Sequence, residues 1–181
     1  MERGGAMLKA ISEVIGSKLV DLDKSQTIGE VVNWVVNPAE RKLSALIVKP
    51  TGIFTKTMVV TTTDIVEYGP QMVVVKNQAA VVAPEEVAGL PQLLKSRHRV
   101  MGERVETAGG KLIGRVEDVL FETTDSTLQK FYIKPTLLGL VTRPDVIIGI
   151  DKVVRIEPRR LVVSDEVGEP TGSPRPVSAP I

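Results

Sequence analysis

The side chains that most often do chemistry in proteins are scarce in this sequence. It has no cysteine, which excludes disulfides, thiolate nucleophiles and thiolate-held zinc or iron–sulfur sites. It has one histidine, His98, so a single chain cannot supply the pair of imidazoles that many metal centres use. Catalysis would have to rely on carboxylates, lysines or hydroxyls. We expect no catalytic residue, metal site or cofactor, and we predict that the chain is not an enzyme.

Two short motifs resemble known sites, and both are incomplete. Asp21-Leu22-Asp23 begins like a calcium loop, but Val32 stands where such a loop ends in a glutamate. Gly109-Gly110-Lys111 lacks the earlier glycine and the following Ser or Thr of a phosphate loop. No Gly-x-Ser-x-Gly segment occurs. We interpret the aspartates as solvated residues of a hairpin and the glycines as turn residues.

A cluster of basic residues permits two interpretations. It consists of Lys95, Arg97, His98, Arg99 and Arg104, and Arg155, Arg159 and Arg160 are expected to lie close to it. Phosphate contacts come mostly from Lys and Arg, so the cluster is a candidate RNA-binding patch. The other interpretation is a solvated rim paired with Glu103, Glu106 and Glu157. The net charge of only +1 and the scarcity of aromatic residues favour the rim.

Apolar residues occupy two segments that should be loops. Each follows a Lys-Pro pair, at residues 51–55 and 136–141. Loops normally carry polar residues because their backbone faces water. The candidate docking residues are Ile53, Phe54, Leu137, Leu138, Leu140 and Val141. Two alternatives stay open: these residues pack between two parts of the chain, or they contact a partner, including a second copy of the chain.

The composition predicts a mainly β protein. Val, Ile and Thr account for 55 of the 181 residues, and these branched side chains pack well on a pleated surface. Short Val- and Ile-rich runs alternate with turn residues, which is typical of barrels and sandwiches. We therefore expect short strands, with short helical segments only in the connecting region.

An internal repeat organises the chain. A shift of 85 positions places residues 17–50 over residues 102–135 without a gap, and pairs Val20 with Val105, Gly29 with Gly114 and Pro50 with Pro135. After a three-residue insertion, the shift becomes 88 for the last strands. We expect the glycine of each copy to mark a bulge or bend in the longest strand, because a missing Cβ permits unusual backbone angles.

The repeat predicts the same strands twice. They lie at 18–22, 27–36, 43–49, 57–61, 65–68 and 71–75, and again from 112–121 and 128–134 to 146–150, 153–156 and 161–164. With no long helix to cover a sheet, closure into a small barrel would bury one apolar face. We expect Val31 and Val35 on one face of the long strand, and Val116 with Leu120 in the second copy. The other face needs cover from the partner unit or from a short helix.

The repeated pattern resembles the PRC-barrel domain. The first copy has Ile28-Gly29-Glu30-Val31 and later Val48-Lys49-Pro50, and the second has Ile113-Gly114-Arg115-Val116 and Ile133-Lys134-Pro135. The resemblance implies two small PRC-type barrels in tandem, in the family of the photosynthetic reaction-centre H subunit and a ribosome-maturation factor. The expected division is 7–80 for the first domain, 81–96 for a linker with helical turns, 97–165 for the second domain and 166–181 for a disordered Pro-rich tail.

The resemblance implies a function in protein–protein interaction. We expect a non-catalytic adaptor that binds another protein, with a homodimer as one form of that contact. The alternatives are an accessory factor in ribosome maturation or RNA metabolism, and a peripheral subunit of a membrane electron-transfer complex. No apolar run is long enough to span a bilayer and residues 1–7 do not form an export signal, so we expect a cytoplasmic protein.

Overall fold

The computed structural model describes residues 7–52, 56–96, 98–135 and 145–168. Strands dominate, and the helices are short, which confirms the predicted fold class. The first sheet, here the N-unit, contains β2 (Lys18–Asp21), β3 (Gln26–Asn37), β4 (Lys42–Pro50), β5 (Met58–Thr61), β6 (Ile65–Gly69) and β7 (Met72–Val75). The second, the C-unit, contains β8 (Arg104–Thr107), β9 (Leu112–Glu122), β10 (Leu128–Pro135), β11 (Val146–Gly149), β12 (Val153–Glu157) and β13 (Arg160–Val163).

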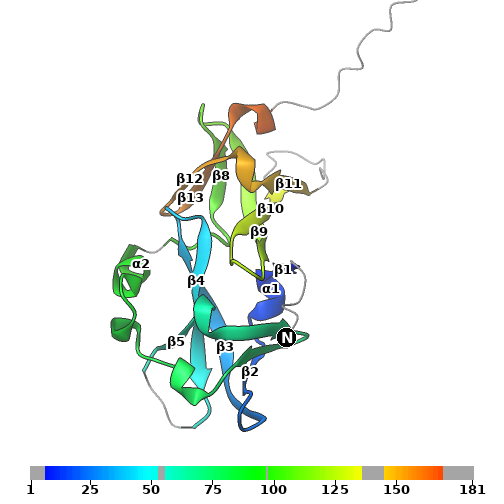
Figure 1. Cartoon of the computed structure of the whole chain (residues 1–181). Coiled ribbons are helices and arrows are strands. Elements are labelled where there is room, and N and C mark those ends of the chain that lie inside the picture. Colours follow the sequence, from blue (N-terminus) through cyan, green and yellow to red (C-terminus); the bar gives the residue numbers. More distant parts are fainter. Residues whose placement is uncertain (1–6, 53–55, 97, 136–144, 169–181) are drawn as a thin grey trace, which may run out of the picture.

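Short elements connect and flank the sheets (Figure 1). The N-terminal pair is β1 (Leu8–Ala10) and α1 (Ile11–Val14), and the longest helix is α2 (Leu90–Ser96), between the units. Single 3-10 turns are η1 (Thr62–Asp64), η2 (Gln78–Ala80), η3 (Pro84–Glu86), η4 (Ile150–Lys152) and η5 (Asp165–Gly168). The helical turns expected in the linker at 81–96 are therefore η3 and α2.

The two sheets have the same topology. Their strand orders are β5-β4-β3-β2-β7-β6 and β11-β10-β9-β8-β13-β12. Each sheet has one parallel pair of neighbouring strands, β2 with β7 in the N-unit and β8 with β13 in the C-unit. The other neighbouring strands are antiparallel. The end strands β5 and β6 do not pair among the described residues, and η1 connects them. Each sheet is thus an open barrel, in which the sheet curls around its apolar face without full hydrogen-bonded closure.

A bulge interrupts the longest strand of each unit at the same place. The extra residue is Val32 in β3 and Glu117 in β9. Because side chains alternate between faces with a period of two, one extra residue reverses the alternation beyond it. Val31, Trp34 and Val36 consequently belong to the same apolar interior.

The bulge explains a wrong prediction about the faces of these strands. Val31 and Val35 were expected to share a face, but Val35 belongs to a separate cluster beneath α2. In the C-unit, Val116 packs in the interior, whereas Leu120 is only partly buried and lies outside that cluster. A bulge inside a strand changes no residue type, so the sequence pattern does not reveal it.

The repeated glycines mark close strand contacts and lie next to bulges, as predicted: Ile28 is an extra residue in the pairing of β3 with β2, and Ile113 in that of β9 with β8. A Cβ on Gly29 would lie 2.8 Å from the backbone oxygen of Lys49, and one on Gly114 would lie even closer to that of Lys134. Glycine at this position lets the end of β4 or β10 approach the long strand. A further bulge lies three residues beyond each glycine, at Val32 and Glu117.

The offset between the copies changes at the first hairpin. Leu19 pairs with Gly29 in β3, and Val105 pairs with Gly114 in β9. Leu19 and Val105 are both fully buried, so they are equivalent at an offset of 86, while the glycines are equivalent at 85. The gapless alignment of Val20 with Val105 is therefore wrong by one residue, because the first hairpin is one residue longer in the N-unit.

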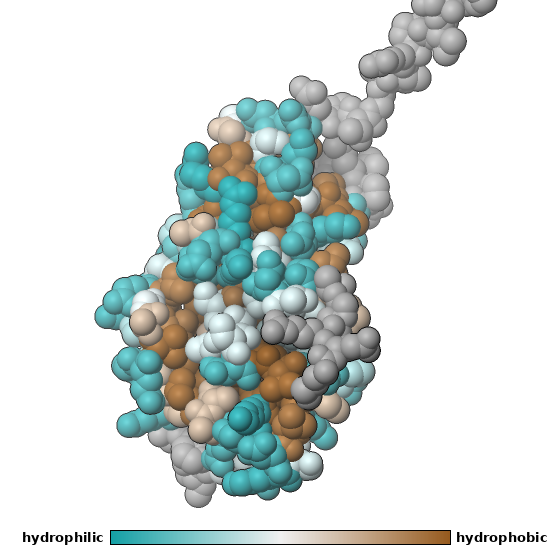
Figure 2. All heavy atoms as spheres, in the orientation of Figure 1, coloured by the Kyte–Doolittle hydropathy of each residue, from teal (hydrophilic) through white to brown (hydrophobic). Residues whose placement is uncertain are grey.

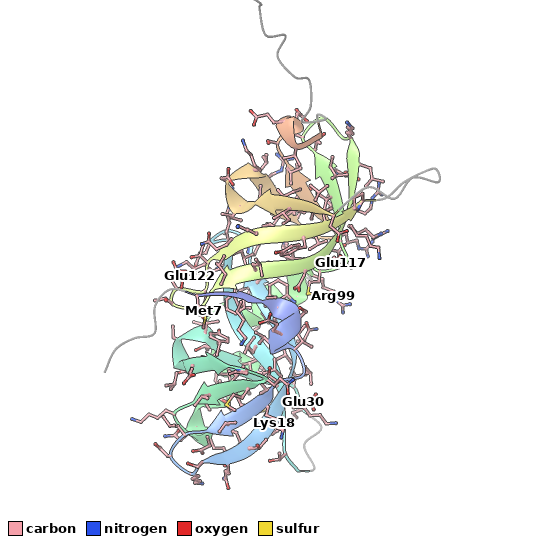
Figure 3. All side chains as sticks on the ribbon, turned by 90° about the vertical axis from the view of Figure 1, so that its right-hand side faces the viewer. Met7, Lys18, Glu30, Arg99, Glu117 and Glu122 are labelled. Carbon is pink, nitrogen blue, oxygen red and sulfur yellow. The ribbon has the colours of Figure 1, made fainter. Side chains whose placement is uncertain are left out.

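The N-terminal segment joins the sheet of the other unit. β1 pairs with β9 in antiparallel register, Leu8 opposite Glu122 and Ala10 opposite Leu120. Figure 3 shows Met7 beside Glu122 at this edge. The hydroxyl of Ser12 donates to the carboxylate of Asp118 at 2.5 Å and fixes the start of α1 on β9. Residues that precede the N-unit in the sequence thus complete the C-unit in space.

Reciprocal hydrogen bonds join the units at their hairpin tips. The N–H of Leu43 donates to the carbonyl of Ser126 and the N–H of Leu128 to that of Arg41, both at 2.9 Å. Each donor and each acceptor lies 85 residues from its counterpart, so the two units meet as equivalent surfaces in a two-fold arrangement. One apolar cluster spans both units. The expectation that the units pack together is confirmed.

Candidate docking site

The apolar loop residues expected at a docking surface lie outside the described residues. They are Ile53, Phe54, Leu137, Leu138, Leu140 and Val141. Their assignment to internal packing or to a partner contact therefore stays a prediction.

Part of the predicted basic cluster belongs to a row of ion pairs on the C-unit. Arg104 contacts Glu106 at 2.9 Å, and Arg160 contacts Glu106 at 3.5 Å and Glu157 at 2.6 Å. Arg155 contacts Glu157 at 2.7 Å. Hydrogen bonds from Arg155 and Arg160 lower the pKa of the Glu157 carboxyl. These guanidinium groups have carboxylate partners, as the solvated-rim interpretation expects, and exposed pairs of this kind add little stability.

The other described members of the cluster lie between the units in the chain, at the end of α2 and in the segment before β8. Lys95 and Arg99 are exposed, and His98 is half-buried, while Arg97 lies outside the described residues. Figure 3 shows Arg99 at the level where the two units meet. A ring nitrogen of His98 is 2.6 Å from the hydroxyl of Ser96, which itself donates to the carbonyl of Leu93 at 2.7 Å. These bonds connect the end of α2 to the segment that enters the C-unit.

A cleft of about 430 Å³ lies beside these residues. One wall comes from the middle of β3 and β4, and the other from α2 and the segment before β8. Its lining consists of Asn33, Trp34, Val35, Ile47, Leu93, Leu94, His98, Arg99 and Met101. Most of these side chains are apolar. His98 and Arg99 carry basic groups, Asn33 carries an amide, and none of the lining residues carries a carboxylate. Such a lining suits a ligand with an apolar group and a negative charge.

Helix α2 holds the far wall of the cleft against the outer face of the N-unit. Leu90 is buried with Val35, Ala45 and Val59, and Leu93 and Leu94 pack at the edge of this cluster. The preceding turn η3 is closed by the Glu86 carboxylate, which accepts a hydrogen bond from the N–H of Ala83 at 2.9 Å. Figure 2 shows apolar atoms along this side of the N-unit. The short helix thus provides the cover that the second apolar face was expected to need.

The side chain of Asn33 lines the cleft and is held by the backbone of the next residue. Its side-chain oxygen accepts a hydrogen bond from the N–H of Trp34 at 2.9 Å. The equivalent residue Asp118 accepts from the N–H of Val119 at 2.8 Å in the same way. No motif of the sequence indicated Asn33 or Trp34 as site residues. The available signal was that Trp34 is the only tryptophan of the chain.

A second cleft, of about 550 Å³, lies next to α1 and is of a different kind. It is lined by Lys9, Ser12, Glu13, Ile15, Gly16, Ser17, Lys18, Pro70 and Gln71. Charges of both signs line it, and Lys9 donates a hydrogen bond to the carbonyl of Gly69 at 2.6 Å. This bond ties β1 of the C-unit sheet to the end of β6. The arrangement supports the joint between the units.

One carboxylate of the rejected calcium motif is buried and not solvated as expected. Asp21 has no exposed surface, and its carboxylate accepts hydrogen bonds from the N–H groups of Lys24 at 2.9 Å and Gln78 at 3.0 Å. It closes the hairpin after β2 and anchors the chain leaving β7. At the equivalent position of the C-unit, the hydroxyl of Thr107 accepts from the N–H of Lys111 at 3.2 Å.

An aromatic pair lies in the core between the units. The ring of Tyr68 meets that of Phe121 edge-on, with 5.2 Å between centroids. The Tyr68 hydroxyl is buried and has no well-aligned hydrogen-bond partner among the described residues. Burial raises its pKa well above the ordinary value, and the nearby Ser126 hydroxyl offsets this only in part. This buried phenol contributes to packing between the units.

Two kinds of feature do not occur in the described residues. Within them, no three His, Cys, Asp or Glu residues lie close enough together to hold a metal ion. None of the helices in this part of the chain is long and apolar enough to cross a membrane.

Comparison with models of protein families matches residues 8–82 to the PRC-barrel domain. This part of the chain is therefore a PRC-barrel domain, as its sequence resemblance predicted, and it comprises β1, α1 and the N-unit. The match does not extend to the C-unit. None of the curated proteins matches the chain.

Proposed function

We propose that the chain is a non-catalytic adaptor that binds other proteins through the outer surface of two joined PRC-barrel units. The observation that carries this proposal is the reciprocal joint between the units. Hydrogen bonds between the hairpin tips and the β1–β9 pairing make the two sheets one body with a shared apolar core. Side chains fill that core, and the clefts lie on the outside.

We also propose that the C-unit is a second PRC-barrel domain. The two sheets have the same strand order, and the bulges at Val32 and Glu117 lie 85 residues apart. Gly29 and Gly114 permit the same close strand approach. Shared topology together with shared irregularities supports duplication, because a bulge is a feature that families keep.

Affinity purification of the full chain from native lysate tests the adaptor function. The tagged chain is used with and without nuclease, and at low and high salt. A stoichiometric protein partner that persists after nuclease treatment supports the proposal. Recovery of ribosomal proteins that are lost on nuclease treatment would overturn it in favour of an RNA-associated function. A tagged protein of similar size serves as the control for the resin.

Binding of RNA is the second candidate because His98 and Arg99 line the same cleft and Lys95 is exposed at the end of α2. A phosphate-dominated interaction weakens steeply as salt rises, whereas a largely apolar protein contact does not. A salt titration of the purified complex therefore distinguishes the two functions. Substitution of Arg99 by glutamate would abolish RNA binding, and Lys134→Glu, which makes the same charge change on β10, is the matched control.

A further inference from the structure

The end of β9 has a strand on both sides, and the equivalent end of β3 does not. β9 pairs with β10 along one edge and with β1 along the other, where Ala10 lies opposite Leu120. The residue of β3 equivalent to Leu120 is Val35. In the described part of the chain, β4 pairs with this end of β3, and no strand pairs with its other edge.

The segment that is equivalent to β1 in the sequence forms a helix and not a strand. The offset of 86 relates Leu8 to Leu94 and Ala10 to Ser96, and both of these belong to α2. The hydroxyl of Ser96 bonds to the carbonyl of Leu93 and closes the last turn of that helix. A helix cannot continue the hydrogen-bond ladder of a sheet, so this edge of β3 has no strand partner in the described residues. Residues 33–35 line the 430 Å³ cleft together with Ile47 of β4 and with Leu93 and Leu94 of α2.

The cleft has the features of a site for an extended peptide. An unpaired strand edge offers backbone donors and acceptors, and side chains at alternate positions of an added strand point into the same pocket. The apolar walls include Trp34, Leu94 and Met101, and the rim carries His98 and Arg99. With no carboxylate in the lining, the charge complements an acidic partner.

We propose that the cleft binds an extended, acidic segment of a partner protein, which pairs with β3 at residues 33–37 as β1 pairs with β9. An apolar side chain of the segment occupies the cleft beside Trp34, and a neighbouring carboxylate faces Arg99. The strand runs antiparallel to β3, as β1 does to β9. This inference rests on the proposed adaptor function and assigns it a site and a class of ligand.

Asn33 has a specific part in this site. Its counterpart Asp118 holds the segment that follows β1, because it accepts hydrogen bonds from the N–H and the hydroxyl of Ser12. Asn33 carries an Nδ2 group in addition to its oxygen, so it can donate to a carboxylate or carbonyl of the incoming strand. Where β9 has the carboxylate of Asp118, which only accepts hydrogen bonds, β3 thus has the amide of Asn33, which can donate one to a negatively charged ligand.

The test uses a phage-displayed library of random twelve-residue peptides selected on the full chain. Selected sequences should alternate apolar residues with others and carry Asp or Glu. As the only tryptophan, Trp34 reports binding at the cleft through its fluorescence. Synthetic copies of the selected peptides should shift its emission and slow hydrogen–deuterium exchange at residues 33–37.

Charge variants then test the assignment of the rim. Arg99→Glu should weaken binding of the selected peptide at least about tenfold, and Asn33→Asp about fivefold, because each adds a negative charge beside the carboxylate. Asn33→Asp is expected to fold, because aspartate stands at the same position of β9. The matched control Lys134→Glu should bind as the unchanged chain does.

Several results would contradict this assignment of the cleft. Peptides that bind without shifting Trp34 emission, without protecting residues 33–37, or equally well to Arg99→Glu would overturn the site, and so would a selection that yields no acidic strand-like sequence. Preferential binding of a twelve-nucleotide uridine RNA at the cleft would also overturn it. If Arg99→Glu and Asn33→Asp leave the nuclease-resistant partner of the affinity purification unchanged, the adaptor function stands and only this site is wrong.

Discussion

The ends of β3 and β9 occupy equivalent places in the two units and have different surroundings. The last residues of β9 lie between β10 and β1, with Asp118 bonded to Ser12. The last residues of β3 lie between β4 and a cleft, with α2 on the far side. The strand order is the same in the two units. The edge of β9 is paired because β1, which precedes the N-unit, adds to it, and the edge of β3 is open because the equivalent segment before the C-unit forms α2. A duplicated fold can therefore keep one edge for its own stability and offer the other to a partner.

The interiors differ as well, although less than the edges. Phe121 fills the position that Val36 occupies in the N-unit, and Tyr68 packs on it from the other side of the joint. The larger side chain lies in the C-unit, and the aromatic residue it meets comes from the N-unit. The core between the units is thus not symmetric, even though the hydrogen bonds at the hairpin tips are reciprocal.

The largest effect is expected when the larger of these two equivalent side chains is truncated. Phe121→Ala leaves a cavity in the shared core and should lower the free energy of unfolding by about 3–5 kcal/mol. The matched change Val36→Ala removes fewer atoms and should cost about 2 kcal/mol. Urea unfolding followed by circular dichroism measures both. Equal losses for the two variants would contradict the view that the aromatic contact dominates the joint.

The buried polar anchors should differ by a smaller amount. Asp21→Ala leaves the N–H groups of Lys24 and Gln78 without their acceptor and should cost about 2–3 kcal/mol. At the equivalent position, Thr107→Ala removes one longer hydrogen bond and should cost about 1 kcal/mol. Thermal unfolding of the two variants gives the comparison. A milder effect for Asp21→Ala than for Thr107→Ala would show that the carboxylate is not an anchor.

Removal of the buried phenol should be harmless at neutral pH. Tyr68→Phe deletes a hydroxyl that lacks a well-aligned partner, so the free energy of unfolding should stay the same or rise by up to about 1 kcal/mol. Its effect should depend on pH. Because burial raises the pKa of Tyr68 in the folded state, the unfolded state ionises first.

Stability tied to Tyr68 is therefore fully present below about pH 10 and declines as the pH rises above this value. The Phe variant should lose less stability than the unchanged chain between pH 9 and about pH 11. Guanidinium unfolding at both pH values measures this difference. A parallel decline in the two proteins would mean that the phenol ionises equally easily in the folded state.

The smallest effect is expected at the row of ion pairs. The described residues of the N-unit form no such row, and Gly69 stands at the position of Glu157. Arginine hydrogen bonds lower the pKa of Glu157, so its contribution is present above the ordinary pKa of a glutamate and declines as the pH falls through the folded-state value. The melting temperatures of the unchanged chain and of Glu157→Gln should converge from pH 6 to pH 3, and at high salt. A constant difference would show that Glu157 acts through packing.

Much of the fold could be predicted from the sequence because the pattern is local. Branched residues between turn signals gave strands close to the observed bounds, and the repeated Ile-Gly-x-Val revealed two equivalent units. Pro84 and Pro91 indicated the short helical turns of the connection. Each of these signals depends on residue type and spacing within about ten positions, which is the range over which backbone preferences act.

The site could be predicted only in part. The basic residues before β8 stood out as a cluster, but their division between the ion pairs of Arg104 and the cleft beside Arg99 did not. Nothing in the sequence indicated that β1 pairs with β9, because strand pairing across more than a hundred residues leaves no local pattern. The solvated interpretation of Asp21 failed for the same reason, since Gln78 is distant in the sequence and adjacent in space.

The sequence alone determined the strand content, the internal repeat and the absence of cysteine chemistry, because composition and short-range periodicity fix these properties. Only the tertiary structure decided which edge each segment covers. A bulge at Val32 redirects every side chain beyond it, and the antiparallel bridge between Lys42 and Thr127 sets the two units face to face. Both follow from contacts that form only when distant parts of the chain meet, and from them come the paired edge of β9 and the open edge of β3.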